Sequence, residues 1–527
     1  MSSADNFTNK ITEGYSFKGD SIILGTAIFE NQPLQNVQIK IPLSTINRHG
    51  LIAGATGTGK TKTVQVFAEA LSEKSIPVLL MDIKGDLSGI AAEGSTNTKI
   101  EERHSKIGIP YQPKKFPVEF LTLSDATGTR LRATVSEFGP VLISKILELN
   151  DTQEGLLAIL FKYCDDNNLP LLDLKDFKKV LQYASNDGKK EIEKDYGSIS
   201  PASIGTILRK VVELEQQGAE VFFGEKSFDV NDLLRIDDNG NGIISVIRLI
   251  DLQDRPKLFS TFMLSLLGEI YSTFPEMGDK AEPKLVIVID EAHLIFKEAS
   301  KALFDQIETI IKLIRSKGVG IYFCTQNPTD VPQAVLSQLG LKIQHALRAF
   351  TAQDRKMIKL TSENYPISEF YKTDELLTSL GIGEAAISAL NEKGVPTPLA
   401  ATLLCAPKSR MDILTADELR DIVNASQLTA KYNDVIDRES AYEILNKKLD
   451  TAREFGLQIP QDRSASSRNS GGYSRTPTKT SSSSARKEKS TMEKVINSPL
   501  SKQVGRTLAR EITRGLLGVL GFGGRRK

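Results

Sequence analysis

The sequence is poor in the residues that several protein classes depend on. It contains no Trp, and aromatic residues make up only 6% of its 527 residues, which is sparse for a protein that stacks bases or sugars. Its three Cys and four His are scattered, so we expect neither a structural zinc site nor a disulfide framework. No apolar run approaches the roughly 20 residues that cross a bilayer, and the N-terminus lacks the apolar segment of a secretion signal. We therefore expect a cytoplasmic protein in a reducing compartment.

Charge is nearly balanced overall but is uneven along the chain. The 67 Lys and Arg residues exceed the 66 Asp and Glu residues by one. Residues 462–527 hold 15 basic and 4 acidic residues, an excess of +11, so the rest of the chain holds 52 basic and 62 acidic residues, or −10. The body is therefore acidic, and the tail is the part expected to seek anions.

A glycine-rich segment lies between an apolar strand and a helical pattern. It fits the pattern G-x-x-x-x-G-K-[ST], in which backbone N–H groups surround phosphate oxygens at a helix N-terminus. The predicted ATP-binding residues are Gly54, Ala55, Thr56, Gly57, Thr58, Gly59, Lys60 and Thr61. Lys60 should reach the β- and γ-phosphates, and the Thr61 hydroxyl should ligate Mg²⁺. The alternative is a chance glycine-rich turn, which the strand before it and the helix after it disfavour.

A second segment, residues 284–291, is an apolar run that ends in two carboxylates. Ligands bind at the C-terminal edge of α/β sheets, so this strand predicts a catalytic role for both acids. Asp290 would hold Mg²⁺, and Glu291 would act as the general base that polarises the attacking water. The alternative is an apolar strand that simply meets an acidic turn.

Two further polar residues follow apolar strands in the same manner. Gln326 follows the strand predicted at residues 320–325 and could orient water at the γ-phosphate, whereas Asp82 follows residues 77–81 and could contact the nucleotide. Capping of a strand end remains the alternative for each residue.

The alternation of strands and helices predicts an α/β fold with a RecA-like P-loop core and a mainly parallel central sheet. An antiparallel hairpin around residues 391–394 would close the core. The predicted parts are a short N-terminal β segment (1–47), the ATPase core (48–136 and 236–410), a mostly helical insertion (137–235), a helical extension (411–461), a disordered basic linker (462–497) and a basic amphipathic helix (498–527).

Residues 48–61, the Asp82-Ile-Lys-Gly-Asp segment, the Asp290-Glu291 strand and the Thr325-Gln326-Asn-Pro segment together resemble the HerA/FtsK superfamily of ring-shaped translocases. The sequence is most similar to the bacterial HerA-like group, over about residues 22–407. This resemblance implies a homo-hexamer with ATP at subunit interfaces and double-stranded DNA in the channel. It also implies a trans-acting arginine, matched by Arg315, and a cis arginine, matched by Arg48.

Each arginine also has a structural interpretation. Arg315 could be a favourable charge at a helix C-terminus, and Arg48 could form a surface salt bridge. Fewer than 50 residues precede the predicted motor, too few for the full β-barrel of archaeal HerA, so we do not expect a nuclease partner bound through such a barrel.

Alternative interpretations remain for the substrate of the motor and for the function of the C-terminal tail. An ATPase of a protein-transport, membrane-associated or regulatory assembly is the alternative to a DNA motor, and a scaffold that only binds ATP is a third. The basic helix at 498–527 could lie on a membrane surface, pack against the ring or a partner, or bind DNA.

Overall fold

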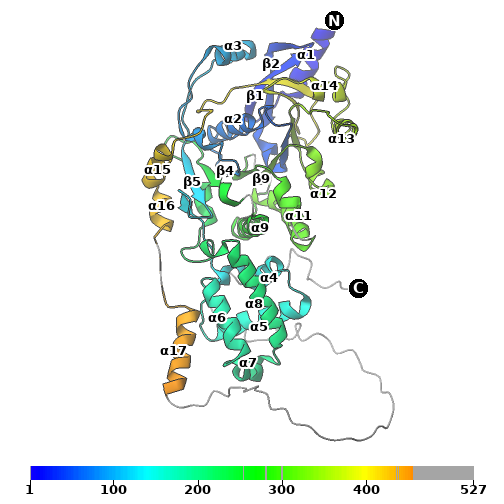
Figure 1. Cartoon of the computed structure of the whole chain (residues 1–527). Coiled ribbons are helices and arrows are strands. Elements are labelled where there is room, and N and C mark those ends of the chain that lie inside the picture. Colours follow the sequence, from blue (N-terminus) through cyan, green and yellow to red (C-terminus); the bar gives the residue numbers. More distant parts are fainter. Residues whose placement is uncertain are drawn as a thin grey trace, which may run out of the picture.

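The computed structural model describes residues 2–454, with short gaps at residues 253–254, 279–281, 298–300, 435 and 437. The predicted linker at 462–497 and the predicted helix at 498–527 lie outside the described residues. Figure 1 shows a body that contains the sheet, with a group of helices below it.

One twelve-stranded sheet forms the centre of the body. In spatial order its strands are β2 (Gln32–Pro42), β1 (Ser21–Phe29), β12 (Ala400–Leu404), β11 (Glu384–Ser388), β10 (Leu341–Gln344), β3 (Gly50–Ala53), β9 (Val319–Thr325), β8 (Leu285–Ile289), β4 (Val78–Asp82), β7 (Ile244–Arg248), β5 (Val118–Thr122) and β6 (Thr129–Arg130). Neighbouring strands from β10 to β6 are parallel, and those from β2 to β10 are antiparallel. This arrangement confirms the predicted α/β fold with a mainly parallel central sheet.

The central strands are apolar on both faces because both faces are covered. All five residues of β8 are buried. Its Leu285, Ile287 and Ile289 enter one hydrophobic core, whereas Val286 and Val288 enter the core on the opposite face. An uninterrupted apolar run is what a parallel strand between two layers requires.

Helices supply both covering layers. Helix α2 (Lys60–Ser72) buries Val64, Phe67 and Leu71 in one core. Helices α9 (Pro256–Thr273) and α11 (Lys301–Ile314) contribute to the other core. The remaining helices around the sheet are α3 (Thr98–Ile107), α10 (His293–Lys297), α12 (Gln333–Leu336), α13 (Ala352–Ser362), α14 (Thr373–Ser379), α15 (Ala416–Ala425) and α16 (Gln427–Tyr432).

The N-terminus contains a helix where the sequence predicted only short strands. Helix α1 (Ser3–Gly14) begins at a capping box in which the Ser2 hydroxyl accepts from Asp5 N and the Asp5 carboxylate accepts from Ser2 N. Its Phe7 and Ile11 are fully buried against the antiparallel strands. The two N-terminal strands do not stand apart, because β1 pairs with β12 in the central sheet.

The lower part of the molecule in Figure 1 is helical, as the periodicity of residues 137–235 indicated. It consists of α4 (Val135–Ile146), α5 (Asp151–Asp166), α6 (Leu174–Ser185), α7 (Lys189–Tyr196) and α8 (Pro201–Gln216). Helix α17 (Ala441–Glu454) joins this group, because Ala441 N donates to Pro170 O and Tyr442 N donates to an Asp176 carboxylate oxygen. The apolar core of the group is continuous with the one beneath β8 through α9.

Within the described residues, the helices include none whose length and apolarity would suit a bilayer crossing.

Candidate functional site

The glycine-rich loop connects the end of β3 to the start of α2. Gly54 and Gly57 have φ angles of 151° and 77°, which side chains rarely adopt. The N-cap of α2 is Gly59, which has no side chain to accept from the first-turn N–H groups. These N–H groups and the helix dipole form the kind of site that holds phosphate.

Lys60 and Thr61 occupy the first turn of α2. Lys60 is buried, and its Nζ donates to Gly54 O at 2.8 Å and to Ala55 O at 3.2 Å. Burial lowers the pKa of Lys60, while the charges of Asp290 and Glu291 oppose this effect. The Thr61 hydroxyl donates to Asp86 Oδ2 at 3.1 Å.

The acidic strand end and the loop meet at the same edge of the sheet. Strand β9 lies between β3 and β8, and all three are parallel. The end of β9 is bonded to both segments, because Gly54 N donates to Thr325 O at 3.3 Å and Ala292 N donates to Cys324 O at 2.9 Å. Two strand spacings separate β3 from β8, or about 10 Å. The two predicted halves of the site therefore lie close together.

Asp290 and Glu291 are buried at this edge. Burial raises the pKa of Asp290, and the nearby charge of Lys84 opposes the rise. Glu291 Oε1 forms an ion pair with Lys84 Nζ, and Glu291 Oε2 lies 3.1 Å from His293 Nδ1. Glu291 has a φ of 45°, an uncommon conformation for a residue with a side chain, and such strain tends to occur at functional sites.

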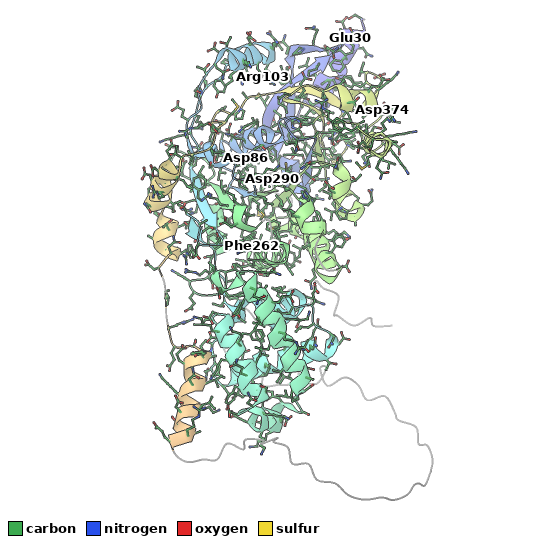
Figure 2. The ribbon with its side chains drawn as sticks, viewed as in Figure 1. Glu30, Asp86, Arg103, Phe262, Asp290 and Asp374 are labelled. Atoms are coloured by element: carbon green, nitrogen blue, oxygen red, sulfur yellow. The ribbon has the colours of Figure 1, made fainter. Side chains whose placement is uncertain are left out.

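Asp82 performs a local task. Its carboxylate accepts from Gly85 N at 2.6 Å and from Leu87 N at 3.1 Å, so it shapes the turn after β4. Burial raises its pKa to about 6. These bonds match the capping interpretation of Asp82. The acid that contacts Thr61 is Asp86, which Figure 2 shows in the sheet-containing body together with Asp290.

Gln326 lies exposed directly after β9, at the same edge as the glycine-rich loop. It therefore emerges between the loop and the acidic strand end. Its predicted role in orienting water stays a prediction.

The two predicted arginines lie at the opposite edge. Arg48 precedes β3, and a Cβ added to Gly394 would lie 2.5 Å from Arg48 Nη1, so the guanidinium packs against the β11–β12 hairpin. The length of β3 separates Arg48 from the loop of its own chain, and this geometry does not support a contact of Arg48 with a phosphate held there. Arg315 is exposed just before β9, and its charge contributes to the low pKa of His49, about 4, for which burial is the main cause.

Four residues of this region were not predicted. They are Lys84 and Asp86 after β4, His293 after β8, and His345, which packs beneath the glycine-rich loop, with its Nε2 2.9 Å from Thr63 Oγ1. The Asp82-Ile-Lys-Gly-Asp segment contributed only to the family resemblance. Charged residues directly after a buried strand also indicate functional positions, and this signal could have identified Lys84 and Asp86 individually.

The residues at the edge suit Mg²⁺ together with a nucleotide. Thr61, Asp86 and Asp290 supply hard oxygen donors, which this cation prefers. In the part of the chain that the structure describes, no group of three or more His, Cys, Asp or Glu side chains forms a metal site. At such loops Mg²⁺ is usually bound by a few protein oxygens, and phosphate oxygens and water complete its coordination.

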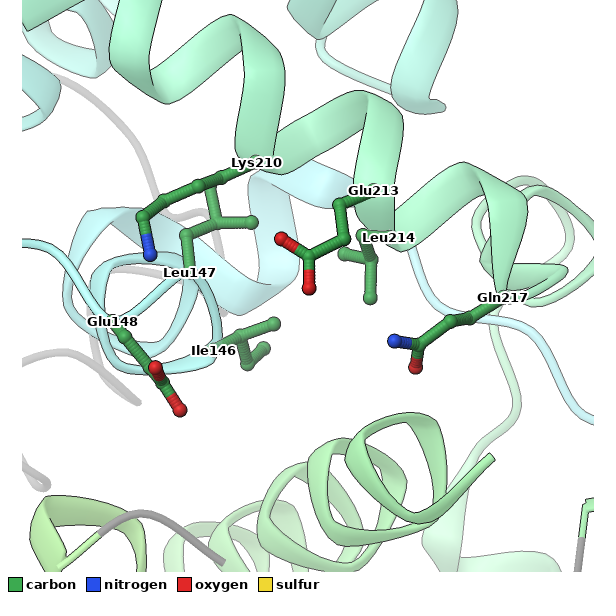
Figure 3. A pocket seen from close by; sticks show the side chains of 7 residues that line it. All are labelled: Ile146, Leu147, Glu148, Lys210, Glu213, Leu214 and Gln217. Carbon is green, nitrogen blue, oxygen red and sulfur yellow. The ribbon is translucent and has the colours of Figure 1, made fainter. Parts of the chain in front are cut away.

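A small hollow between α4 and α8 is unrelated to this site. Figure 3 shows its lining, which includes Glu148, Lys210, Glu213 and Gln217. Its volume is about 20 Å³, room for no more than a water molecule. It has no space for a substrate.

Comparison with known proteins identifies the family. The family model described as helicase HerA-like C-terminal, HerA_C, matches residues 28–527. The chain belongs to the HerA_C family. This finding confirms the resemblance to HerA-type P-loop ATPases that the motifs indicated.

Relatives of this HerA_C chain include proteins named as helicases. The chain is 26% identical over 358 residues to the DNA double-strand break repair helicase HerA of Sulfurisphaera tokodaii, an alignment that covers 67% of this chain and 64% of the relative. It is also 26% identical over 362 residues to a probable helicase of Methanocaldococcus jannaschii, covering 67% of this chain and 62% of the relative. The chain thus spans less than two thirds of the length of these relatives.

Solved structures that match this chain include the bacterial conjugative coupling protein TrwB in complex with sulphate. That match has 15% identity, a TM-score of 0.49 and coverage of 77% of this chain and 94% of the TrwB chain. VirB4 of Thermoanaerobacter pseudethanolicus has 15% identity, a TM-score of 0.45 and coverage of 77% of this chain and all of that chain.

Proposed function

We propose that this HerA_C chain is an ATP-hydrolysing motor that assembles as a ring and translocates on or remodels double-stranded DNA. One observation carries the proposal: β9 holds the start of the glycine-rich loop and the turn after Asp290 at one sheet edge. A phosphate-binding helix N-terminus and a general base then meet at one place, as hydrolysis of a nucleoside triphosphate requires.

The residues divide the work by their chemistry. Lys60 and the first-turn N–H groups of α2 neutralise phosphate charge. Thr61 and Asp290, with Asp86 nearby, hold Mg²⁺, which when bound screens the charge that develops on the phosphates. Glu291 accepts a proton from the attacking water, and Gln326 orients that water.

The position of Arg315 supports assembly. It lies exposed at the opposite sheet edge from the loop of its own chain, so only the loop of another copy is available to it. A guanidinium supplied by a neighbour would stabilise charge on the transferred phosphoryl group and make turnover depend on the ring. Family resemblance sets the expected number of copies at six.

Relatives named as DNA double-strand break repair helicases support DNA as the substrate. The acidic body offers little independent support, but six copies need few phosphate contacts each. Action on a protein or at a membrane-linked assembly is the competing outcome of the test below.

The test measures ATP turnover with and without duplex DNA, together with the molecular mass in solution. We expect a particle of about six chains and turnover that duplex DNA stimulates at low salt. Hydrolysis without stimulation by DNA would refute the DNA substrate, and a monomer with full activity would refute the ring.

A matched pair of variants tests the catalytic assignment. Glu291→Gln should lower turnover by about 100-fold or more while nucleotide binding persists, because it removes the base and keeps the shape. Glu119→Gln is the control. Glu119 is also buried, lies on the distant strand β5 and pairs with a cation, since its carboxylate is 2.9 Å from the Arg235 guanidinium. Glu291→Gln with normal turnover would refute the mechanism.

A further inference from the structure

The candidate base is held by a lysine from the neighbouring strand. Strand β4 lies beside β8, and Asp290 N donates to Met81 O at 3.3 Å, which places the segment after β4 next to the acidic turn. Lys84 emerges from this segment and its ammonium pairs with Glu291 Oε1. The other carboxylate oxygen faces His293.

This ion pair competes with general-base catalysis, because the Lys84 ammonium occupies one side of the oxygen that would otherwise accept from the attacking water. Departure of Lys84 frees this oxygen for water. The Lys84 side chain is 42% exposed, whereas that of Glu291 is 7% exposed, so the lysine is the partner with room to move.

The surroundings of Lys84 favour retention of its positive charge. Its ammonium pairs with Glu291, and the negative charges of Asp290 and Asp86 also act on it. A charged ammonium that leaves a carboxylate needs another anion within reach. The terminal phosphate of a nucleotide on the loop beside Lys60 is such an anion, since the charge of Lys84 is also felt by Lys60.

We propose that Lys84 is a positioning residue that exchanges Glu291 for the terminal phosphate of a bound nucleoside triphosphate. The base is thereby released when the loop holds a triphosphate and is held when it holds a diphosphate. This inference rests on the proposed ATPase function, and it adds discrimination between the substrate and the product of the reaction.

A structural ion pair would behave differently. Lys74 pairs with Asp20 at 3.3 Å, and the Lys74 side chain is 36% exposed, close to the value for Lys84. Its carboxylate partner is 63% exposed and far from any candidate base, so the pair should contribute little. Lys74→Met is therefore a matched control for Lys84→Met.

The experiment measures the dissociation constants of fluorescent ADP and of a fluorescent non-hydrolysable ATP analogue with the full chain and Mg²⁺. Lys84→Met is compared in the Glu291→Gln background. Otherwise loss of Lys84 would leave the Glu291 carboxylate without its ammonium partner, and the carboxylate charge alone would repel the terminal phosphate. We expect Lys84→Met to weaken binding of the analogue about tenfold in that background, as loss of one charge-assisted contact does. Binding of ADP should change by less than about threefold, and Lys74→Met should change neither ligand.

Two results would overturn the inference alone while hydrolysis by the unmodified chain stands. Unchanged binding of the analogue would show that Lys84 only neutralises Glu291. Equal weakening of both ligands would show a general effect of charge or structure. If Lys84→Met fails to fold, as judged from its melting temperature, Lys84→Gln carries the same expectations. Absence of binding of either nucleotide to the unmodified chain would refute the proposed function and this inference together.

Discussion

Substitutions at two glycines of the glycine-rich loop should separate an effect on stability from an effect on nucleotide binding. Gly54 and Gly57 both have positive φ angles, but their surroundings differ. A Cβ added to Gly54 would lie 2.5 Å from His345 Cβ and 3.1 Å from two backbone atoms of the same residue, whereas a Cβ added to Gly57 would meet nothing within 4 Å. We therefore expect Gly54→Ala to damage the fold and Gly57→Ala to damage the site.

The magnitudes follow from these distances. At Gly57 an alanine suffers only backbone strain, about 1–2 kcal/mol, part of which the lower entropy of the unfolded chain offsets. A loss of about 1 kcal/mol in unfolding free energy is expected. At Gly54 comparable strain adds to overpacking against the backbone of His345, about 1–3 kcal/mol more. A loss of roughly 3 kcal/mol is expected there.

The assay combines urea denaturation with nucleotide binding. Gly57→Ala should bind the ATP analogue at least about tenfold more weakly despite its near-normal stability, because the new methyl group occupies space beside the inward N–H groups of the loop. Comparable stability losses for the two variants would refute the packing argument. Normal nucleotide binding by Gly57→Ala would refute the assignment of the loop.

Three further predictions address the neighbouring groups. Thr61→Val should lower the Mg²⁺-dependent part of nucleotide affinity about tenfold, measured with and without the cation, with a stability change near 1 kcal/mol from the lost bond to Asp86. Arg315→Ala should reduce turnover by about 100-fold or more in the assembled protein and leave nucleotide affinity unchanged, measured by steady-state kinetics and fluorescence. Burial lowers the pKa of His345 to about 4, so the unfolded chain binds its proton first and stability falls as the pH drops below about 6.5. Between pH 7.5 and 5.0, the unfolding free energy of His345→Asn should therefore fall by about 2 kcal/mol less than that of the unmodified chain, measured by urea denaturation.

The parts of the site that could be predicted from the sequence are those in which chemistry and strand pattern are local. The loop at residues 54–61 matches a phosphate-binding pattern by itself, and the apolar run before Asp290 identifies both a buried strand and the sheet edge at which its two carboxylates lie. The mainly parallel sheet follows from the same pattern, since strands without alternation must be covered on two faces.

The contacts between segments could not be predicted in the same way. Lys84 contacts Glu291 because β4 pairs with β8, and the local sequence of neither segment predicts the order of strands in the sheet. The family resemblance implied a cis arginine at Arg48, yet the length of β3 separates Arg48 from the glycine-rich loop of its own chain. Helix α1 has weak local signals, a capping box at Ser2 and apolar residues four apart, within a mainly polar stretch.

Under the proposed mechanism, the two edges of the sheet explain why one chain should be insufficient for efficient turnover. Parallel strands place every loop that follows a strand at one edge of the sheet. The glycine-rich loop, the turn at Asp290 and Glu291, and Gln326 therefore lie together at that edge. Segments that precede strands gather at the other edge, where Arg315 lies with Arg48 and His49. The length of a strand separates the residues at one edge from those at the other, and no side chain is long enough to span that distance. A positive charge from the second edge can therefore act on the first only when two copies meet, with the edge of one facing the loop of the other.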